Sequence, residues 1–269
     1  MHTVVCIKQI IDPEIPPHLF RLDPVTKRQA RGRQVLLISD FDAIALEVAL
    51  QLREKAGGKV TAITIGEMGE REAKEALHTA LAMGADETLL LSDPAFGRPD
   101  SLGKARILAA ALRKIGDFDL VLCGRQAGDV ELGLVGPFLA EEMGLPCATL
   151  IANVEPSGDG VRLRRPIEGG YEVLAAPLPL VATVTNDESN VARYASVRGL
   201  RRAMRTPVPV WSAADLGLDP ATVGPEEARL VLDEVFIPQR ESRCEFITGE
   251  TGEEKARRLL ERLRELHLV

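Results

Sequence analysis

Strand-like and helix-like patterns alternate along the first 146 residues, and this alternation constrains the fold more than any other feature. Short apolar, β-branched runs lie at residues 3–7, 59–65, 87–91 and 118–123, and segments with helical spacing lie at 43–55, 70–83, 101–114 and from 137 onward. A repeated β-α order requires parallel strands, because each helix returns the chain to the same edge of the sheet. We therefore predict an α/β fold with a doubly wound, mainly parallel sheet, helices on both faces and an irregular C-terminal arm.

The strand ends define where a ligand is expected. Ligands of parallel sheets bind beyond the carboxyl ends of the strands, where Cys6, Ile65 and the loop after residue 123 would converge. That loop is rich in glycine and leads from a buried strand to a helix start at Pro137, an arrangement that exposes backbone N–H groups to a phosphate. An ordinary strand-to-helix connection has the same pattern, so the spacing alone leaves both interpretations open. Asp42 is expected to cap the helix that follows it.

The chain changes character after Pro146. Strand-like runs at 148–154, 161–165, 171–175 and 180–185 complete a core that we place at residues 1–185. Residues 186–269 form the arm, which is basic and partly helical as far as residue 214 and has no core pattern at 207–252. It ends in an amphipathic helix at 253–266 that Thr251, or alternatively Thr248, would cap. We expect the arm to lie against another surface. Its five arginines between residues 193 and 205 suit either a solvated face or the docking of an acidic partner.

Composition excludes several classes of function. The net charge of −7 argues against a nucleic-acid partner, and no stretch approaches the roughly 20 apolar residues of a membrane helix. The N-terminus has the pattern of a first strand rather than of a signal peptide, and four scattered cysteines without a C-x-x-C motif fit a reduced, cytoplasmic protein. Neither the cysteines nor the four histidines have ligand spacing, so no metal site is expected.

Motifs for self-sufficient catalysis are absent from the sequence, which contains no G-x-G-x-x-G, P-loop or G-x-S-x-G motif. Asp129 and Glu131, in the glycine-rich loop, could serve as an acid–base pair. They would also repel a phosphate, so a contact with ribose or adenine suits them better. The chain is therefore predicted to be a binding protein rather than a catalyst.

Several short motifs occur in an order that is characteristic of one family. They are V-C-I-K-Q at residues 5–9, A-L-A-M-G-A-D at 80–86, G-R-Q-A at 124–127, I-E-G-G at 167–170, A-R-Y at 192–194 and E-E-K-A at 253–256. In this order the motifs cover nearly the whole chain. The chain resembles the β subunit of electron-transfer flavoprotein.

The resemblance implies a heterodimer with an α subunit that holds a redox-active FAD near the interface and onto which the C-terminal arm wraps. Electrons would pass from an acyl-CoA dehydrogenase of fatty-acid β-oxidation, or another flavin dehydrogenase, through this FAD to a quinone oxidoreductase. The β core of the familiar form binds AMP, without a redox role. By position, this pocket would contain Cys6, Ser39, Asp40, Phe41, Asp42, Ile65, Gly124, Arg125, Gln126, Ala127, Gly128, Asp129, Gly133, Leu134 and Val135. The family's docking loop would correspond to a segment that includes Arg193, Tyr194, Val197, Leu200 and Met204.

Departures from the family pattern leave the ligand of this pocket open. Gly133, Leu134 and Val135 stand where the family commonly has polar side chains, so backbone N–H groups would have to bind a phosphate. Residues 92–101 and 249–254 look like the branch related to nitrogen fixation and electron bifurcation, in which this site holds a second FAD and the complex is NADH-linked. AMP needs less room, and we place it first. A stand-alone adenine-nucleotide sensor of the universal-stress type is the alternative of another class, although such sensors are smaller and more compact.

Overall fold

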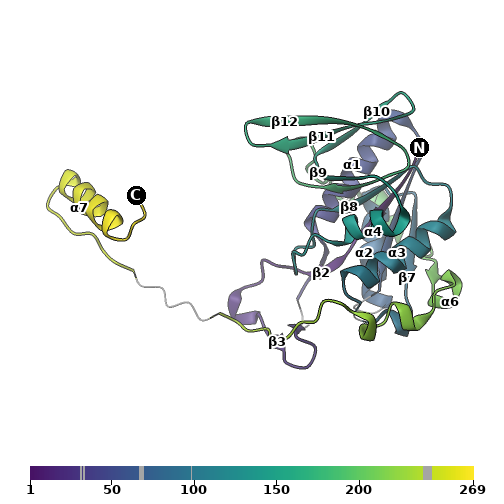
Figure 1. Cartoon of the computed structure of the whole chain (residues 1–269), viewed down its shortest axis with the longest axis horizontal. Coiled ribbons are helices and arrows are strands. Elements are labelled where there is room, and N and C mark those ends of the chain that lie inside the picture. The colour runs from purple at the N-terminus through teal and green to yellow at the C-terminus, as the bar shows by residue number, and fades with distance from the viewer. Residues whose placement is uncertain (31, 33, 67–69, 98, 239–243) are drawn as a thin grey trace. The chain divides into compact units, whose positions relative to one another are not determined.

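A seven-stranded sheet forms the centre of the larger of two compact units, Met1–Asp233 and Glu234–Val269 (Figure 1). The structure is a computed structural model that describes residues 1–30, 32, 34–66, 70–97, 99–238 and 244–269. All the strand pairs in this sheet are parallel. Across the sheet, the strands are β14 (Val210–Trp211), β7 (Glu87–Leu91), β6 (Lys59–Ile65), β1 (His2–Cys6), β8 (Leu120–Gly124), β13 (Leu180–Val184) and β9 (Cys147–Ile151).

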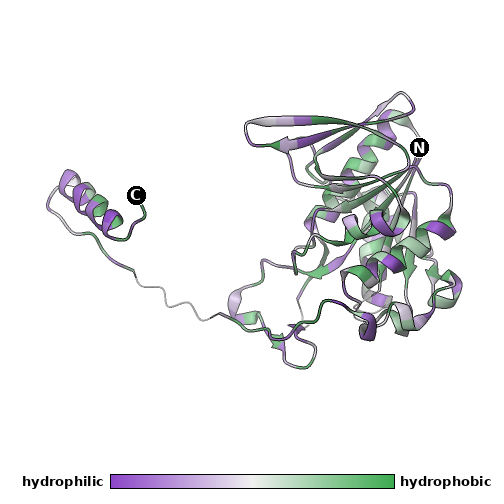
Figure 2. Ribbon diagram, viewed as in Figure 1, coloured by the Kyte–Doolittle hydropathy of each residue, from purple (hydrophilic) through white to green (hydrophobic). Residues whose placement is uncertain are grey.

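Helices cover both faces of this sheet, which confirms the predicted doubly wound α/β fold. One hydrophobic core lies under α1 (Asp40–Ala56) and α2 (Glu70–Met83), and it includes Val5 and Leu122. A second core lies under α3 (Ser101–Ile115) and α4 (Val135–Met143), and it includes Val4 and Val121. Neighbouring residues of one strand thus enter opposite cores, as the two-residue period of a strand requires. Figure 2 shows the hydrophobic residues concentrated in the strands and on the helix faces of this unit.

Local sequence signals set most of the element boundaries. The predicted bounds of β6, α2 and β7 are confirmed. Asp100 caps α3 by accepting a hydrogen bond from the N–H of Gly103 at 2.8 Å. Helix α4 begins at Val135, two residues before the predicted start at Pro137, and ends at Gly144, whose left-handed φ of 63° stops the helix.

The predicted strand at 148–154 is wrong, because the chain leaves the central sheet within it. Residues up to Ile151 form β9, and the next strand, β10 (Asn153–Ser157), belongs to a separate antiparallel sheet with β11 (Gly160–Ile167) and β12 (Gly170–Pro177). Leu150, Ile151 and Ala152 are consecutive apolar residues across this junction, so the pattern alone does not reveal the change of sheet. Two shorter antiparallel pairs, β2 (Gln9–Ile11) with β5 (Leu36–Ile38) and β3 (Leu22–Asp23) with β4 (Arg28–Gln29), fill the segment between β1 and α1.

Residues 186–233 add further elements to the larger unit. They form α5 (Val197–Ala203), β14 and α6 (Ala213–Leu216), followed by two short 3-10 turns. Strand β14 pairs with β7, and Ala213 and Val223 are buried in the second core, although the sequence shows no core pattern here. The division between a nucleotide-binding core at 1–185 and a partner-binding arm at 186–269 stays a prediction about function.

The smaller unit contains α7 (Gly252–Glu265), which has no buried residue. Thr251 caps this helix as predicted, by accepting a hydrogen bond from the N–H of Glu254. Among the helices that the structure describes, none is long and apolar enough to cross a membrane.

Candidate functional site

The carboxyl ends of β1 and β8 form the point at which the winding of the sheet reverses. From β1 the chain continues to β6 and β7 on one side, and then returns through α3 to β8 on the other side of β1. Such a reversal opens a crevice between the two strand ends, which is where α/β sheets bind ligands. Cys6 and Cys123 lie opposite each other there, and both are free thiols in the core. The hydrogen bond with the Cys6 thiol, together with burial, raises the pKa of Cys123.

Asp42, in the first turn of α1, joins the two sides of this crevice. Its Oδ2 accepts from the N–H of Lys8, just after β1, and its Oδ1 accepts from the N–H of Gly124, at the end of β8; both distances are 2.9 Å. Burial raises the pKa of Asp42 to about 7, although these two hydrogen bonds act in the opposite direction. Gly124 has to be glycine, because a Cβ would lie 2.4 Å from Asp42 Oδ1. The prediction that Asp42 caps α1 is wrong: the N-cap is Ser39, and Asp42 reaches across strands instead.

Side chains from β1 and α1 hold the glycine-rich loop at residues 124–135. Lys8 Nζ lies 2.7 Å from a carboxylate oxygen of Asp129, so Asp129 is neutralised by an ion pair within the chain. The Ser39 hydroxyl accepts from the N–H of Gly128 at 3.2 Å. The Arg125 guanidinium stacks 4.5 Å from the centroid of the Phe41 ring. These contacts fix the loop over the crevice.

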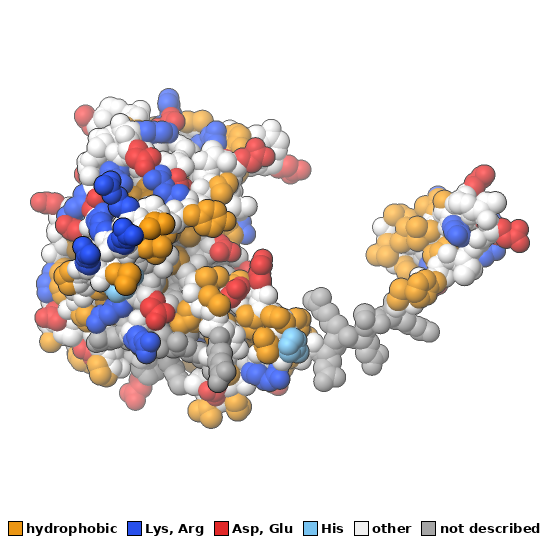
Figure 3. All heavy atoms as spheres, turned by 180° about the vertical axis from the view of Figure 1, so that it is seen from behind, with side chains coloured by type: hydrophobic (Ala, Val, Ile, Leu, Met, Phe, Trp, Pro, Cys, Tyr) orange, Lys and Arg blue, Asp and Glu red, His pale blue; other side chains and the backbone are white. Residues whose placement is uncertain are grey.

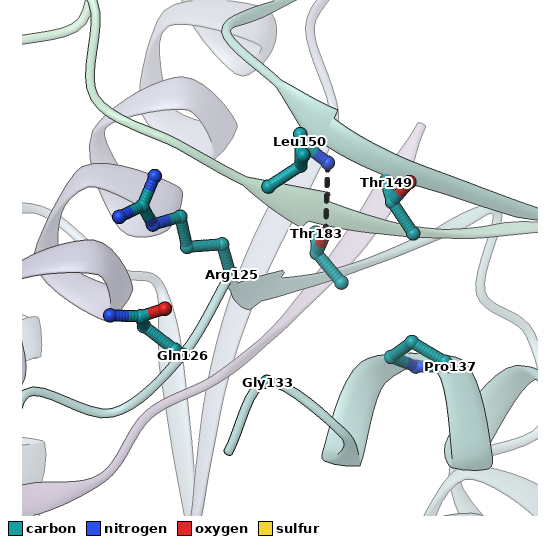
Figure 4. A pocket seen from close by; sticks show the side chains of 7 residues that line it. All are labelled: Arg125, Gln126, Gly133, Pro137, Thr149, Leu150 and Thr183. Atoms are coloured by element: carbon teal, nitrogen blue, oxygen red, sulfur yellow. Dashed lines mark hydrogen bonds between the residues drawn. The ribbon is translucent and has the colours of Figure 1, made fainter. Parts of the chain in front are cut away.

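A cavity of about 450 Å³ lies beside the loop, between the start of α4 and the ends of β13 and β9 (Figure 4). Its lining is formed by Arg125, Gln126, Gly133, Pro137, Thr149, Leu150 and Thr183. The volume is within the range of small-molecule sites. Arg125 Nε is buried and has no hydrogen-bond partner among the described residues. Because Pro137 has no N–H, the free N–H groups in the first turn of α4 are those of Val135 and Gly136.

The positions of two residues of the cavity wall, Thr149 and Leu150, depend on an irregularity in β9. Leu150 has a left-handed φ of 58°, and the register between β9 and β13 shifts beside it. Its N–H donates to Oγ1 of Thr183 at 3.0 Å instead of joining the strand ladder. On the other side of Thr183, α4 approaches so closely that a Cβ on Gly136 would lie 2.4 Å from Thr183 Cγ2. Thr183 therefore sets the distance between α4 and the sheet.

The structure brings most of the predicted pocket residues to one edge of the sheet, in two groups. The crevice group contains Cys6, Ser39, Phe41, Asp42, Gly124, Gly128 and Asp129, and the cavity group contains Arg125, Gln126 and Gly133. Ile65 ends the neighbouring strand β6, Asp40 is exposed in the first turn of α1, Ala127 lies within the loop, and Leu134 and Val135 begin α4. The ligand-binding roles of all the predicted pocket residues stay predictions.

Sequence reasoning missed Lys8 and four cavity residues, Pro137, Thr149, Leu150 and Thr183, of which Pro137 was expected only as a helix start. Lys8 had a usable signal, because it is a charged residue directly after a buried strand whose end was already expected at the site. Thr183 also lies near the end of an expected strand. Thr149 and Leu150 had no such signal, because their position depends on the irregularity in β9.

The predicted docking residues lie in and beside α5, and four of them are strongly exposed. Tyr194 is 98% exposed and Met204 84%, while Val197 and Leu200 are also exposed on this short helix. Figure 3 shows basic side chains gathered beside exposed hydrophobic ones on the larger unit, consistent with the arginines of this segment. Arg193 differs, because its side chain binds carboxylates of α1 in its own chain. No group of three or more His, Cys, Asp or Glu side chains suited to a metal ion occurs among the described residues.

Comparisons with known proteins agree with this geometry. The model of the electron transfer flavoprotein domain family matches residues 30–216. The chain is 38% identical to the electron transfer flavoprotein subunit beta of Thermoanaerobacterium thermosaccharolyticum, over 100% of both chains. It is 35% identical to the caffeyl-CoA reductase-Etf complex subunit CarD of Acetobacterium woodii, again over 100% of both chains. It is 38% identical to protein FixA of Azorhizobium caulinodans, over 88% of this chain and 85% of the relative. The chain therefore belongs to the electron transfer flavoprotein family, among its β-subunit and FixA-like members.

Proposed function

We propose that the chain is the β subunit of a heterodimeric electron carrier, whose α subunit holds an FAD near the interface. The observation that carries this proposal is the full-length similarity to a protein named as an electron transfer flavoprotein β subunit. The fold supports it, because the chain combines a crevice suited to a nucleotide with a short helix, α5, that exposes Val197 and Leu200 among arginines and so suits a partner. Electron transfer between flavins requires proximity rather than acid–base residues, and Asp129, the best candidate for such a residue, is paired with Lys8.

The ligand proposed for the crevice and cavity is AMP, which has no redox role. The residues fit an adenine nucleotide: Arg125 has a buried Nε without a partner among the described residues, and the first turn of α4 offers the N–H groups of Val135 and Gly136. Gly124 and Gly136 leave no room for a side chain, so they hold α1 and β13 close around the site. Asp42 already accepts from the N–H groups of Lys8 and Gly124, which directs a phosphate away from these donors and toward the cavity.

A second FAD in place of AMP is the alternative proposal, and it would add a redox centre to this subunit. The similarity to a subunit of a caffeyl-CoA reductase-Etf complex and to FixA proteins favours it. So does the loop, where Gly133 leaves more room than a polar side chain would. In that case the complex would be an NADH-linked, electron-bifurcating enzyme.

Counting the nucleotides in the purified complex distinguishes these proposals. The chain is co-expressed with an α subunit, the complex is denatured, and the released flavin and AMP are quantified by chromatography. One FAD and one AMP per heterodimer are expected for the simple carrier, and two FAD for the alternative. A colourless chain that stays monomeric in the presence of the α subunit would refute the electron-carrier proposal itself.

The proposed route of electrons begins at a flavin dehydrogenase, such as an acyl-CoA dehydrogenase, and ends at a quinone oxidoreductase, in the cytoplasm. The dehydrogenase would bind α5, with Val197 as the apolar anchor, because an exposed side chain ringed by arginines suits a transient contact. Val197→Ala is expected to slow reduction of the complex by the dehydrogenase without loss of FAD. The matched control is Val25→Ala, since Val25 is also exposed but lies in the turn between β3 and β4. Equal reduction rates for the two variants would contradict the docking role.

A further inference from the structure

Arg193 is bound to α1 by two carboxylates, Glu47 and Glu54, which lie about two turns apart on that helix. Its Nε lies 2.6 Å from Oε2 of Glu47 and its Nη2 lies 3.0 Å from Oε1, so the pair is bidentate. Its Nη1 lies 2.6 Å from Oε1 of Glu54, and its backbone N–H also donates to Glu47. The Arg193 side chain is only about one-third exposed (32%). Such paired geometry is the strong form of an arginine–carboxylate interaction.

Glu47 is a buried charged residue of α1, and only 4% of it is exposed. Burial alone would raise the pKa of Glu47, but hydrogen bonds from Arg193 and from Gln51 outweigh it and hold that pKa below its ordinary value. Gln51 also donates to the carbonyl of Ser189, four residues before Arg193. A buried carboxylate that lost its arginine would be strongly unfavourable, so Glu47 keeps Arg193 in place.

The segment on either side of Arg193 is fixed as well. Before it, the fully buried Asn190 donates to the carbonyls of Ala152 and Thr185 at 2.8 Å. After it, α5 lies against α2 so closely that a Cβ on Gly199 would be 2.1 Å from the carbonyl oxygen of Ala82. Tyr194 and Val197, two of the four exposed side chains of the docking segment, lie between these two fixed points.

We propose that Arg193 is a positioning residue for docking rather than a contact of the dehydrogenase. The clamp of Glu47, Arg193 and Glu54 fixes the start of the docking segment on α1, so that Tyr194 and Val197 stand out in one orientation before a partner arrives. A surface that is ordered in advance binds more tightly, because no ordering entropy is lost on association. This inference rests on the proposed function.

The test uses the complex with the α subunit and two substitutions, Arg193→Lys and Glu47→Gln. Lysine keeps the charge but cannot make the bidentate pair, and Glu47 is too deeply buried to touch a partner. Both variants are expected to raise the KM of the dehydrogenase for the complex by roughly threefold to tenfold, because only the ordered fraction of the segment binds. The kcat and the FAD content are expected to stay unchanged. Hydrogen exchange of the amides at residues 191–199, measured without the dehydrogenase, is expected to become faster.

Arg162→Lys is the matched control, because Arg162 forms an exposed ion pair with Glu155 at 3.0 Å, on the separate antiparallel sheet. It is expected to change neither the KM nor the exchange at 191–199. A raised KM for Arg193→Lys combined with an unchanged KM for Glu47→Gln would mean that Arg193 touches the partner directly, and would overturn the inference. So would normal exchange in both variants. If Val197→Ala is also without effect, the docking role in the proposed function has failed; if only Val197→Ala raises the KM, the clamp alone has failed.

Discussion

Replacing Asp42 by asparagine is expected to change stability in opposite directions at low and high pH. In the protein, each carboxylate oxygen accepts one backbone N–H, from Lys8 and from Gly124. Asparagine has one acceptor oxygen, so its amide NH₂ would face the other N–H group. An unsatisfied buried donor costs about 1–3 kcal/mol. Asparagine carries no charge, however, and it removes the cost of burying the carboxylate.

The pH dependence follows from the raised pKa of Asp42. Between its ordinary value of 3.8 and the value of about 7 in the fold, the folded protein holds a proton that the unfolded chain has released. The stability contributed by this proton is complete below the unfolded pKa and is lost as the pH rises through 7. At about 1.4 kcal/mol per pH unit, the wild type loses roughly 3 kcal/mol relative to Asp42→Asn between about pH 5 and pH 7. The variant is therefore expected to be the less stable protein at about pH 4 and the more stable one at about pH 8.

The assay is urea unfolding of the nucleotide-free chain, followed by fluorescence of its single tryptophan. Trp211 lies on β14, half-buried beneath the Lys114 ammonium, so unfolding changes its surroundings. Asp93→Asn is the matched control, since the Asp93 oxygens also accept one backbone N–H each, at 2.9 and 3.0 Å, but in a half-buried place. A stability difference between wild type and Asp42→Asn that stays constant from about pH 5 to pH 8 would refute the reasoning. It would mean that the two N–H donors outweigh burial and keep Asp42 ionised.

Two further predictions concern close approaches that require glycine. Gly136→Ala is expected to push α4 away from Thr183 and to lower the AMP or FAD content of the purified complex; adding Thr183→Ser should restore it, because serine lacks the clashing Cγ2 but keeps the hydroxyl that accepts from Leu150. Failure of this rescue would show that the contact does not shape the cavity. Gly199→Ala is expected to displace α5 from Ala82 and to slow reduction by the dehydrogenase, whereas Gly252→Ala, in open space at the start of α7, should not. An unchanged rate of reduction in Gly199→Ala would show that docking does not depend on the position of α5.

The order of elements in the first 146 residues could be predicted because each signal was local. A strand such as β6 is recognised from its own β-branched run, and α2 ends at Gly84, directly after its last apolar residue. The switch point followed from the same order, since parallel strands place their carboxyl ends on one edge. The position of β13 could not be predicted in this way. In the chain, β13 follows the separate antiparallel sheet, and in the central sheet it lies between β8 and β9. Its five residues contain no signal that specifies these two strands as its pairing partners.

The polar side chains of α1 show why the site was harder to predict than the fold. Helical periodicity identifies only the apolar stripe of a helix. A carboxylate outside that stripe is then interpreted either as a helix cap or as a solvent-exposed group. Yet Asp42 accepts from Gly124, 82 residues away, and Glu47 binds Arg193, 146 residues away. A carboxylate can stay charged in the interior only if a hydrogen-bond donor pairs with it. Here the donors come from distant parts of the chain, so they can be identified only after the order of the strands is known. One helix therefore supports both the crevice and the docking segment, through residues whose role the sequence of that helix does not reveal.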